Sequence, residues 1–238
     1  MIGRWHRAGT RFAKDRRGTT MVEFAIAVSL FLLIFFAVLD FGRLAYNWVM
    51  AEKAMQRAAR IAAVRPPICR GVPRVNERRD RFDGTYPAGT MCRVDSDLCL
   101  GAEPVACTLA DVSSSDLEAL ATASEIWTSI LPMLPDSHGG DPVAPSNVVL
   151  RYEFDPQLGF LGGPYTPVIT AELVGAPTEG DFGDFCFAFL TPLSALAAAS
   201  GAAATIDENC NDDANPTIPF PDVSASIPAE DMNLGGRG

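Results

Sequence analysis

The N-terminal segment contains, at residues 16–39, the sequence RRGTTMVEFAIAVSLFLLIFFAVL, which decides how the chain begins to fold. From Phe24 to Leu39 this stretch has no charged side chain. As an α-helix rising ~1.5 Å per residue, Gly18 to Leu39 would extend about 33 Å, which is enough to cross a hydrocarbon core of about 30 Å. The sequence therefore predicts a membrane-spanning helix, with Met21 to Leu39 as the span.

Charge is distributed unevenly on the two sides of this span. Residues 1–18 carry six Lys and Arg against one Asp, whereas residues 101–238 carry two Arg against 20 Asp and Glu. Basic residues beside a span remain cytoplasmic, so we expect a single-pass protein with a cytoplasmic N-terminus and the rest of the chain outside. An acidic body has no basic face for phosphate groups, which excludes nucleic acid as the partner.

Three kinds of N-terminal segment place a basic stretch before an apolar one. A cleaved secretory signal peptide needs a small-x-small site after the apolar run, and residues 39–44 provide none. The pair Arg16-Arg17 fits a twin-arginine signal, but that signal needs the same missing site. A simple signal anchor explains every feature except Glu23, because a carboxylate inside a membrane helix is costly unless it is paired.

Cleavage after Gly18 would give Glu23 a function. Thr19 would then carry the new terminal ammonium, and Glu23, followed by the aromatic Phe24, would be the fifth residue of the mature chain. In a bundle of such helices, the Glu23 carboxylate of one subunit can neutralise the Thr19 ammonium of a neighbour. The pattern Gly-x-x-x-x-Glu-aromatic behind a basic leader resembles the cleavage signal of type IV prepilins.

Further motifs follow in a fixed order: Arg17-Gly18, Val22-Glu23-Phe24, Phe41-Gly42-Arg43 and Ala58-Ala59-Arg60. Through these motifs, residues 16–65 resemble the TadE-like pseudopilin family of tight-adherence (Tad, or Flp) pilus systems. The resemblance implies a non-enzymatic structural component of pilus biogenesis in the bacterial inner membrane, with a periplasmic C-terminal domain. The implied partners are the membrane, a prepilin peptidase, other pilins or pseudopilins and the Tad assembly machinery. A TadF-like or TadG-like role stays open, as does a place in the filament, at its tip or in its assembly.

The remaining sequence predicts an α+β, pilin-like fold in which the long N-terminal transmembrane helix precedes a small extracytoplasmic domain with an antiparallel sheet. No proline interrupts Thr19 to Val64, and Pro66-Pro67 ends the helix. Alanines within this helix form two stripes, which suit either a helix bundle or packing on the protein's own domain. The stripes are Ala54, Ala58 and Ala62, and Ala51, Ala59 and Ala63.

Beyond the prolines, local patterns predict further elements. Ser115 followed by Glu118 is typical of a capping box, for a helix within residues 109–131. Strands are predicted at 148–154, 167–174 and 185–190, and a further helix at 192–204. The expected domains are a leader (1–18), the N-terminal helix (19–65), an extracytoplasmic domain (66–210) and a loose tail (211–238).

All the cysteines lie beyond the span: Cys69, Cys92, Cys99, Cys107, Cys186 and Cys210. An even number in the exported part indicates disulfides formed in an oxidising compartment. Short loops favour the pairs Cys99–Cys107 and Cys186–Cys210, although spacing alone does not fix the connectivity. Zinc is disfavoured because no C-x-x-C motif is present and His138 is the only histidine nearby.

No residue set predicts catalysis, and we expect no catalytic residues, resident metal or cofactor. Asp207 to Asp213 alternate Asp and Asn like the start of a calcium loop, but Asp212 and Ile218 stand where that loop needs Gly and Glu. We favour a solvated acidic turn there and leave calcium open. The competing class is a signal-anchored extracytoplasmic enzyme or binding module, whose function would lie wholly in residues 66–238.

Overall fold

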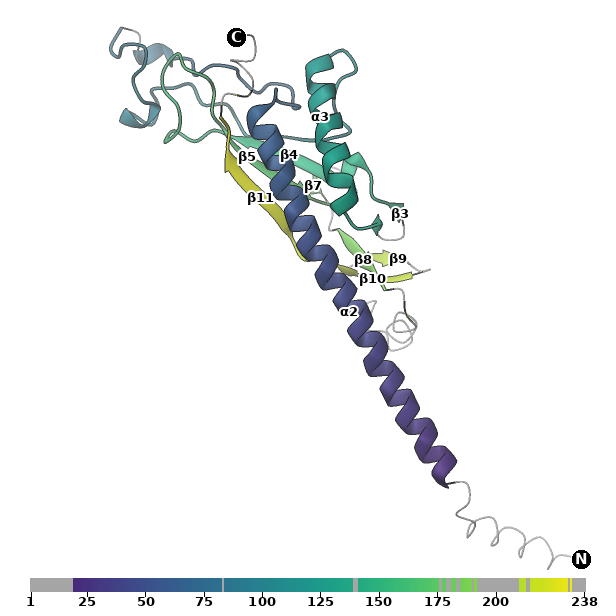
Figure 1. Ribbon diagram of the computed structural model, residues 1–238. Helices are drawn as coiled ribbons and strands as arrows, with labels where there is room; N and C mark the ends of the chain where they lie inside the picture. Colours follow the sequence, from purple (N-terminus) through teal and green to yellow (C-terminus); the bar gives the residue numbers. More distant parts are fainter. Residues whose placement is uncertain are drawn as a thin grey trace, which may run out of the picture.

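The computed structural model describes residues 19–82, 84–138, 141–175, 177–178, 181–182, 185–189, 191, 210–212, 215–230 and 232. A long N-terminal helix carries an α+β domain along its C-terminal half, and its N-terminal half projects away from that domain (Figure 1). The predicted fold class is confirmed.

The long helix, α2, runs over Thr19–Val64 and has 46 residues. It ends where expected, just before Pro66-Pro67. All of its buried residues lie from Asp40 onward. Among the described residues, α2 is the one helix long and apolar enough to cross a membrane.

The C-terminal half of α2 packs on the protein's own domain through its alanines. The small side chains let the helix backbone lie close to the sheet and to the second helix, α3 (Leu117–Ile130). Of the two roles that the alanine stripes suit, the structure therefore shows packing on the domain. The buried residues of this half are Ala51, Ala54, Met55, Ala58, Ala59, Ala62 and Ala63.

The main sheet has four antiparallel strands in the order β1-β4-β5-β11. Their bounds are Val105–Thr108 (β1), Val148–Glu153 (β4), Val168–Leu173 (β5) and Val223–Pro228 (β11). The helix α2 lies against β5 and β11, with α3 beside it (Figure 1). In β5, Ile169, Ala171 and Leu173 are buried while the residues between them are half-exposed, so the sheet has one core face and one outer face.

Smaller elements complete the described part of the chain. A three-stranded sheet has the order β8-β10-β9, and two short hairpins pair β2 with β3 and β6 with β7. The strand bounds are Ser137–His138 (β2), Asp141–Pro142 (β3), Pro177–Thr178 (β6), Asp181–Phe182 (β7), Cys186–Ala188 (β8), Asn211–Asp212 (β9) and Asn215–Pro219 (β10). The 3-10 helices are Asp80–Phe82, Cys92–Val94, Leu131–Met133 and Pro145–Asn147.

The prediction of a loose tail at 211–238 is wrong for β10 and β11. Strand β11 pairs with β5 over its whole length, from Val223 opposite Leu173 to Pro228 opposite Val168. Beyond it, the backbone N–H of Glu230 donates to the carbonyl of Ala63 at the end of α2. An edge strand tolerates proline because one row of its backbone groups is unpaired in the sheet, so the prolines around β11 do not prevent strand formation.

The second helix starts later than the sequence pattern indicates. Asp116, not Ser115, is the N-cap, since its carboxylate accepts a hydrogen bond from the backbone N–H of Ala119 at 3.0 Å. The Ser115 hydroxyl instead lies 2.8 Å from that of Ser113. Strand β1 was not predicted, and the helix expected at 192–204 lies outside the described residues.

Candidate functional site: the N-terminal helix and its junction with the domain

The N-terminal half of α2 presents a large apolar surface. Phe24, Phe31 and Val38 are exposed to 69%, 65% and 66%. Leaving such side chains in water costs ~25 cal/mol per Å² of apolar surface, so this half requires a bilayer or other apolar helices around it. The bounds of the predicted span, Met21 to Leu39, stay a prediction.

Glu23 lies on this exposed half, next to Phe24. Among the described residues it has no hydrogen-bond or ion-pair partner. Thr19 begins the helix one turn before Glu23 and is also exposed, so the two residues share one face. Gly18 lies outside the described residues, and the roles assigned to Gly18, Thr19, Glu23 and Phe24 stay predictions.

The helix meets the small sheet at Arg43. Its guanidinium donates a hydrogen bond to the carbonyl oxygen of Ala188 at 3.0 Å and lies 4.7 Å from the ring centroid of Phe187. A hydrogen bond and a cation–π contact from one planar group fix its orientation. Arg43 therefore holds β8 against the helix just beyond the predicted span.

One turn earlier, Asp40 and Phe41 add two further contacts. Asp40 is only 2% exposed, and its carboxylate accepts a hydrogen bond from the hydroxyl of Thr191. The ring of Phe41 meets that of Phe189 edge-on, with centroids 6.2 Å apart. We call Asp40, Phe41 and Arg43, with their partners, the junction.

Sequence reasoning found the helix side of the junction but not its partners. Phe41 and Arg43 belong to the motif Phe41-Gly42-Arg43, whereas Ala188 lies 145 residues beyond Arg43 and Thr191 lies 151 residues beyond Asp40. In the sequence, the opposite charges of Asp40 and Arg43 directly follow the apolar run. This pattern indicates that the two side chains make polar contacts, but it does not identify their partners.

Replacing Arg43 by alanine should destabilise the domain by about 2 kcal/mol, because a charged hydrogen bond and a cation–π contact are lost together. Denaturant unfolding of the detergent-solubilised protein measures the change. Arg57→Ala, which removes an arginine on the exposed face of the same helix, is the control and should change stability by less than about 0.5 kcal/mol. Equal stability of the two variants would contradict the assigned contacts.

The cysteines form three disulfides, so part of the predicted pairing is wrong. Cys186–Cys210 is confirmed, but Cys99 pairs with Cys92 and Cys107 pairs with Cys69. The loop from Cys92 to Cys99 is shorter still than the predicted one. Just after Pro66-Pro67, Cys69 lies beside Cys107 of β1, with their Cα atoms 5.6 Å apart.

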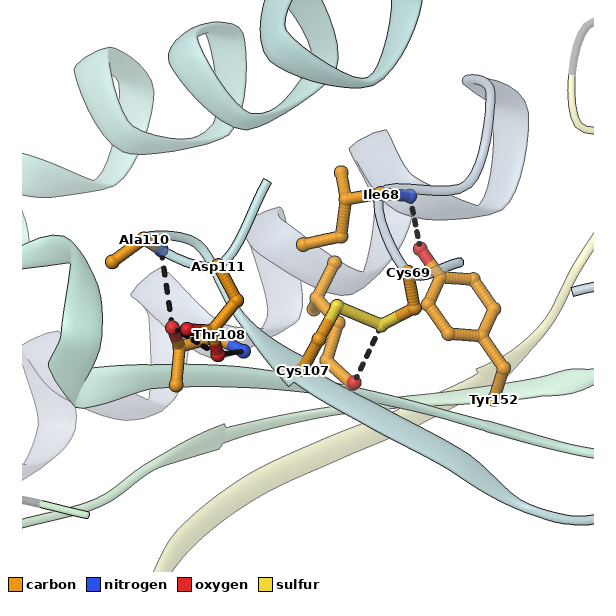
Figure 2. Close-up of a disulfide and its surroundings, with 8 residues drawn as sticks. Ile68, Cys69, Cys107, Thr108, Ala110, Asp111 and Tyr152 are labelled. Atoms are coloured by element: carbon orange, nitrogen blue, oxygen red, sulfur yellow. Dashed lines mark hydrogen bonds between the residues drawn. A yellow bond between two sulfur atoms is a disulfide. The ribbon is translucent and has the colours of Figure 1, made fainter. Parts of the chain in front are cut away.

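Figure 2 shows how the Cys69–Cys107 disulfide is packed between the end of α2 and the main sheet. Next to it, the backbone N–H of Ile68 donates a hydrogen bond to the hydroxyl of Tyr152 at 3.3 Å. Burial raises the pKa of Tyr152 to about 12, with the Ile68 hydrogen bond acting in the opposite direction. This disulfide therefore fixes the point where the chain leaves the long helix.

No cluster of three or more metal-ligating side chains occurs in the part of the chain that the structure describes. Of the calcium candidate Asp207 to Asp213, only residues 210–212 are described. That candidate is therefore not tested.

The family model described as TadE-like protein matches residues 18–60. No curated protein and no solved structure matches the chain. The matched range covers α2 except its last turn, and so contains Glu23 and the helix side of the junction but none of the sheet. An exposed apolar helix that is similar to a family of pilus components indicates a membrane-anchored, pilus-associated protein. From Gly18 to Arg60, the chain is similar to TadE-like proteins.

Proposed function

We propose that the protein is a pseudopilin or minor-pilin-like structural component in the biogenesis of a Tad pilus. The observation that carries this proposal is the division of α2 inside the TadE-like segment. Its first half is apolar and exposed, and its second half is fixed to the domain. Before assembly, the apolar half of such a subunit lies in the membrane. During assembly, it packs against the helices of other subunits.

Processing is the first step of the proposed mechanism. A separate prepilin peptidase cleaves after Gly18 and leaves Thr19 as the mature N-terminus. This chain supplies only the substrate residues. The basic leader, the glycine and the nearby Glu23-Phe24 support this step.

Assembly is the second step. The Glu23 carboxylate of one subunit neutralises the Thr19 ammonium of its neighbour among apolar helices, which fixes the axial register. The exposed position of Glu23, one turn from Thr19, supports this role.

The proposed location is the bacterial inner membrane, with the leader cytoplasmic and the domain periplasmic. Two observations support it: the excess of basic residues before the span and the three disulfides beyond it. The proposed domains are those expected from the sequence, except that the C-terminal strands belong with the domain.

Exchanging the span tests this function against a signal-anchored enzyme or binding module. Residues 24–39 are replaced by an unrelated apolar helix of equal length, with Gly18, Thr19 and Glu23 kept, in a bacterium whose own copy is deleted. If the protein is a structural component, this variant should insert into the membrane and export its domain normally. It should not restore surface pili, whereas the unaltered chain should.

Microscopy counts the pili, and non-reducing electrophoresis shows whether the variant's disulfides have formed. Full piliation with the exchanged helix would contradict the proposal, because an enzyme or binding module needs only an anchor.

A further inference from the structure

The C-terminal half of α2 has a face that the domain leaves uncovered. Tyr46 and Val49 are exposed to 65% and 42%, and the basic residues that follow them are exposed as well. At ~3.6 residues per turn, this face lies opposite the buried alanines. We call it the outer stripe; it consists of Tyr46, Val49, Lys53, Arg57 and Arg60.

The three cations of the outer stripe have no hydrogen-bond or ion-pair partner among the described residues. They follow one another at spacings of four and three residues, so like charges are neighbours on the helix surface and repel. Arginines elsewhere in the chain do have carboxylate partners; Arg65, for example, forms an ion pair with Glu125 at 3.0 Å. The stripe is thus a row of uncompensated positive charge on a chain whose net charge is −10.

With the membrane span ending at Leu39, as predicted, the lipid headgroups do not reach the outer stripe. Lys53 is 14 residues beyond Leu39, about 21 Å along a helix, and Arg60 is about 31 Å along. The polar region of a bilayer adds only about 5–8 Å on each side of the hydrocarbon core. The stripe therefore faces the extracytoplasmic space, where an acidic protein surface fits it.

The opposite side of the same molecule provides such a surface. In the main sheet, α2 covers the core face, and Glu153 and Glu172 project from the outer face. Both lie near one cation, since Arg151 is 3.9 Å from Glu153 and 3.7 Å from Glu172. Their side chains stay 49% and 28% exposed, so the outer face keeps a negative excess.

On the β11 side, small side chains flank these carboxylates. Thr170 and Ser226 are hydrogen-bonded neighbours on the outer face, 2.8 Å apart, and Ser224 lies opposite Glu172. No large side chain from β11 stands above them. A helix can therefore approach the sheet closely from the β11 side, whereas on the β4 side Val149, opposite Glu172, is fully buried.

We infer that the outer stripe docks on the outer sheet face of a second copy of this chain. The two surfaces lie on opposite sides of one helix-on-sheet layer, so the contact is head-to-tail and continues from copy to copy instead of closing into a two-fold dimer. This inference rests on the proposed function and adds a partner surface to it.

Charge exchange between two differently tagged copies tests the inference. In membranes solubilised with mild detergent, wild-type copies should co-purify. Lys53→Glu with Arg57→Glu in both copies should reduce co-purification at least tenfold. Adding Glu153→Arg and Glu172→Arg to both copies should restore it, because the two surfaces then carry exchanged charges.

The matched control is Arg70→Glu with Arg93→Glu. It changes charge equally at two exposed arginines outside the stripe and should leave co-purification unchanged. Undiminished co-purification of the stripe variant, or no restoration by the exchanged charges, would overturn the inference. Loss of pili in the stripe variant with co-purification intact would also overturn it, since the stripe would then bind another partner.

This assay counts pairs of copies and does not depend on pili. Its failure therefore leaves the proposed pilus function standing. Conversely, full piliation with the exchanged span would remove the proposed function without changing the co-purification result.

Discussion

Replacing Gly18 by leucine is expected to leave the protein as an uncleaved precursor, 18 residues longer than the mature chain. A leucine side chain at the cleaved bond would obstruct the close approach of the peptidase to the backbone, which glycine permits. Immunoblotting of membranes, followed by intact-mass measurement, detects the retained leader. Because the leader keeps a charged segment on the cytoplasmic side, this variant should also fail to enter pili.

Gly3→Leu is the matched control, since it adds the same side chain elsewhere in the leader. It should be processed like the wild type. If Gly18→Leu also yields the mature size, Gly18 does not mark the cleaved bond.

Glu23→Ala is expected to be cleaved normally but to be incorporated far less into the assembly. The substitution leaves the ammonium of a neighbouring Thr19 unpaired among apolar helices, and breaking a buried pair in this way costs about 3–5 kcal/mol. At about 1.4 kcal/mol per factor of ten, the loss corresponds to roughly a hundredfold or more. Quantitative blotting of sheared pili against the membrane pool measures it.

Two further variants test whether the charge of Glu23 matters, as opposed to its shape or the mere presence of a polar group in this half of the helix. Glu23→Gln keeps the shape and should be as defective as alanine, because it lacks the charge. Ser29→Ala removes a polar group from the same half of the helix, where the hydroxyl only donates to the Ala25 carbonyl, and should assemble normally. Normal incorporation of Glu23→Ala would remove the charge-pair mechanism but not the TadE-like resemblance.

The long helix could be predicted to its last residue because its determinants are local. An apolar run sets its first half, and Pro66-Pro67 sets its end. The pairing of β4 with β5 was also within reach, since both strands are rich in Val, Ile and Leu and lie close together in the chain.

Long-range partners could not be predicted in the same way. Strand β11 alternates small polar and apolar residues between prolines, and only its pairing with β5 identifies it as part of the sheet. Cys69 and Cys107 are 38 residues apart, and Cys92 and Cys99 lie between them in the sequence. Spacing alone therefore favoured a shorter loop. Such contacts depend on where the whole chain places each element, which short patterns do not encode.

In the proposed pilus component, the junction would link the position of the apolar half of α2 to that of the domain. Arg43 fixes β8 to α2, and at the far end the Glu230 N–H donates to the carbonyl of Ala63. The helix is thus tied to the domain near both ends of its C-terminal half. Any axial movement of the helix during assembly moves the domain with it.

The most direct test of the account is the N-terminal sequence of the wild-type protein, purified from the membranes of a bacterium that assembles Tad pili. We expect a mature chain that starts at Thr19, with Glu23 as its fifth residue. A chain that starts at Met1, as for a simple signal anchor, or beyond Leu39, as for a cleaved signal peptide, would contradict it.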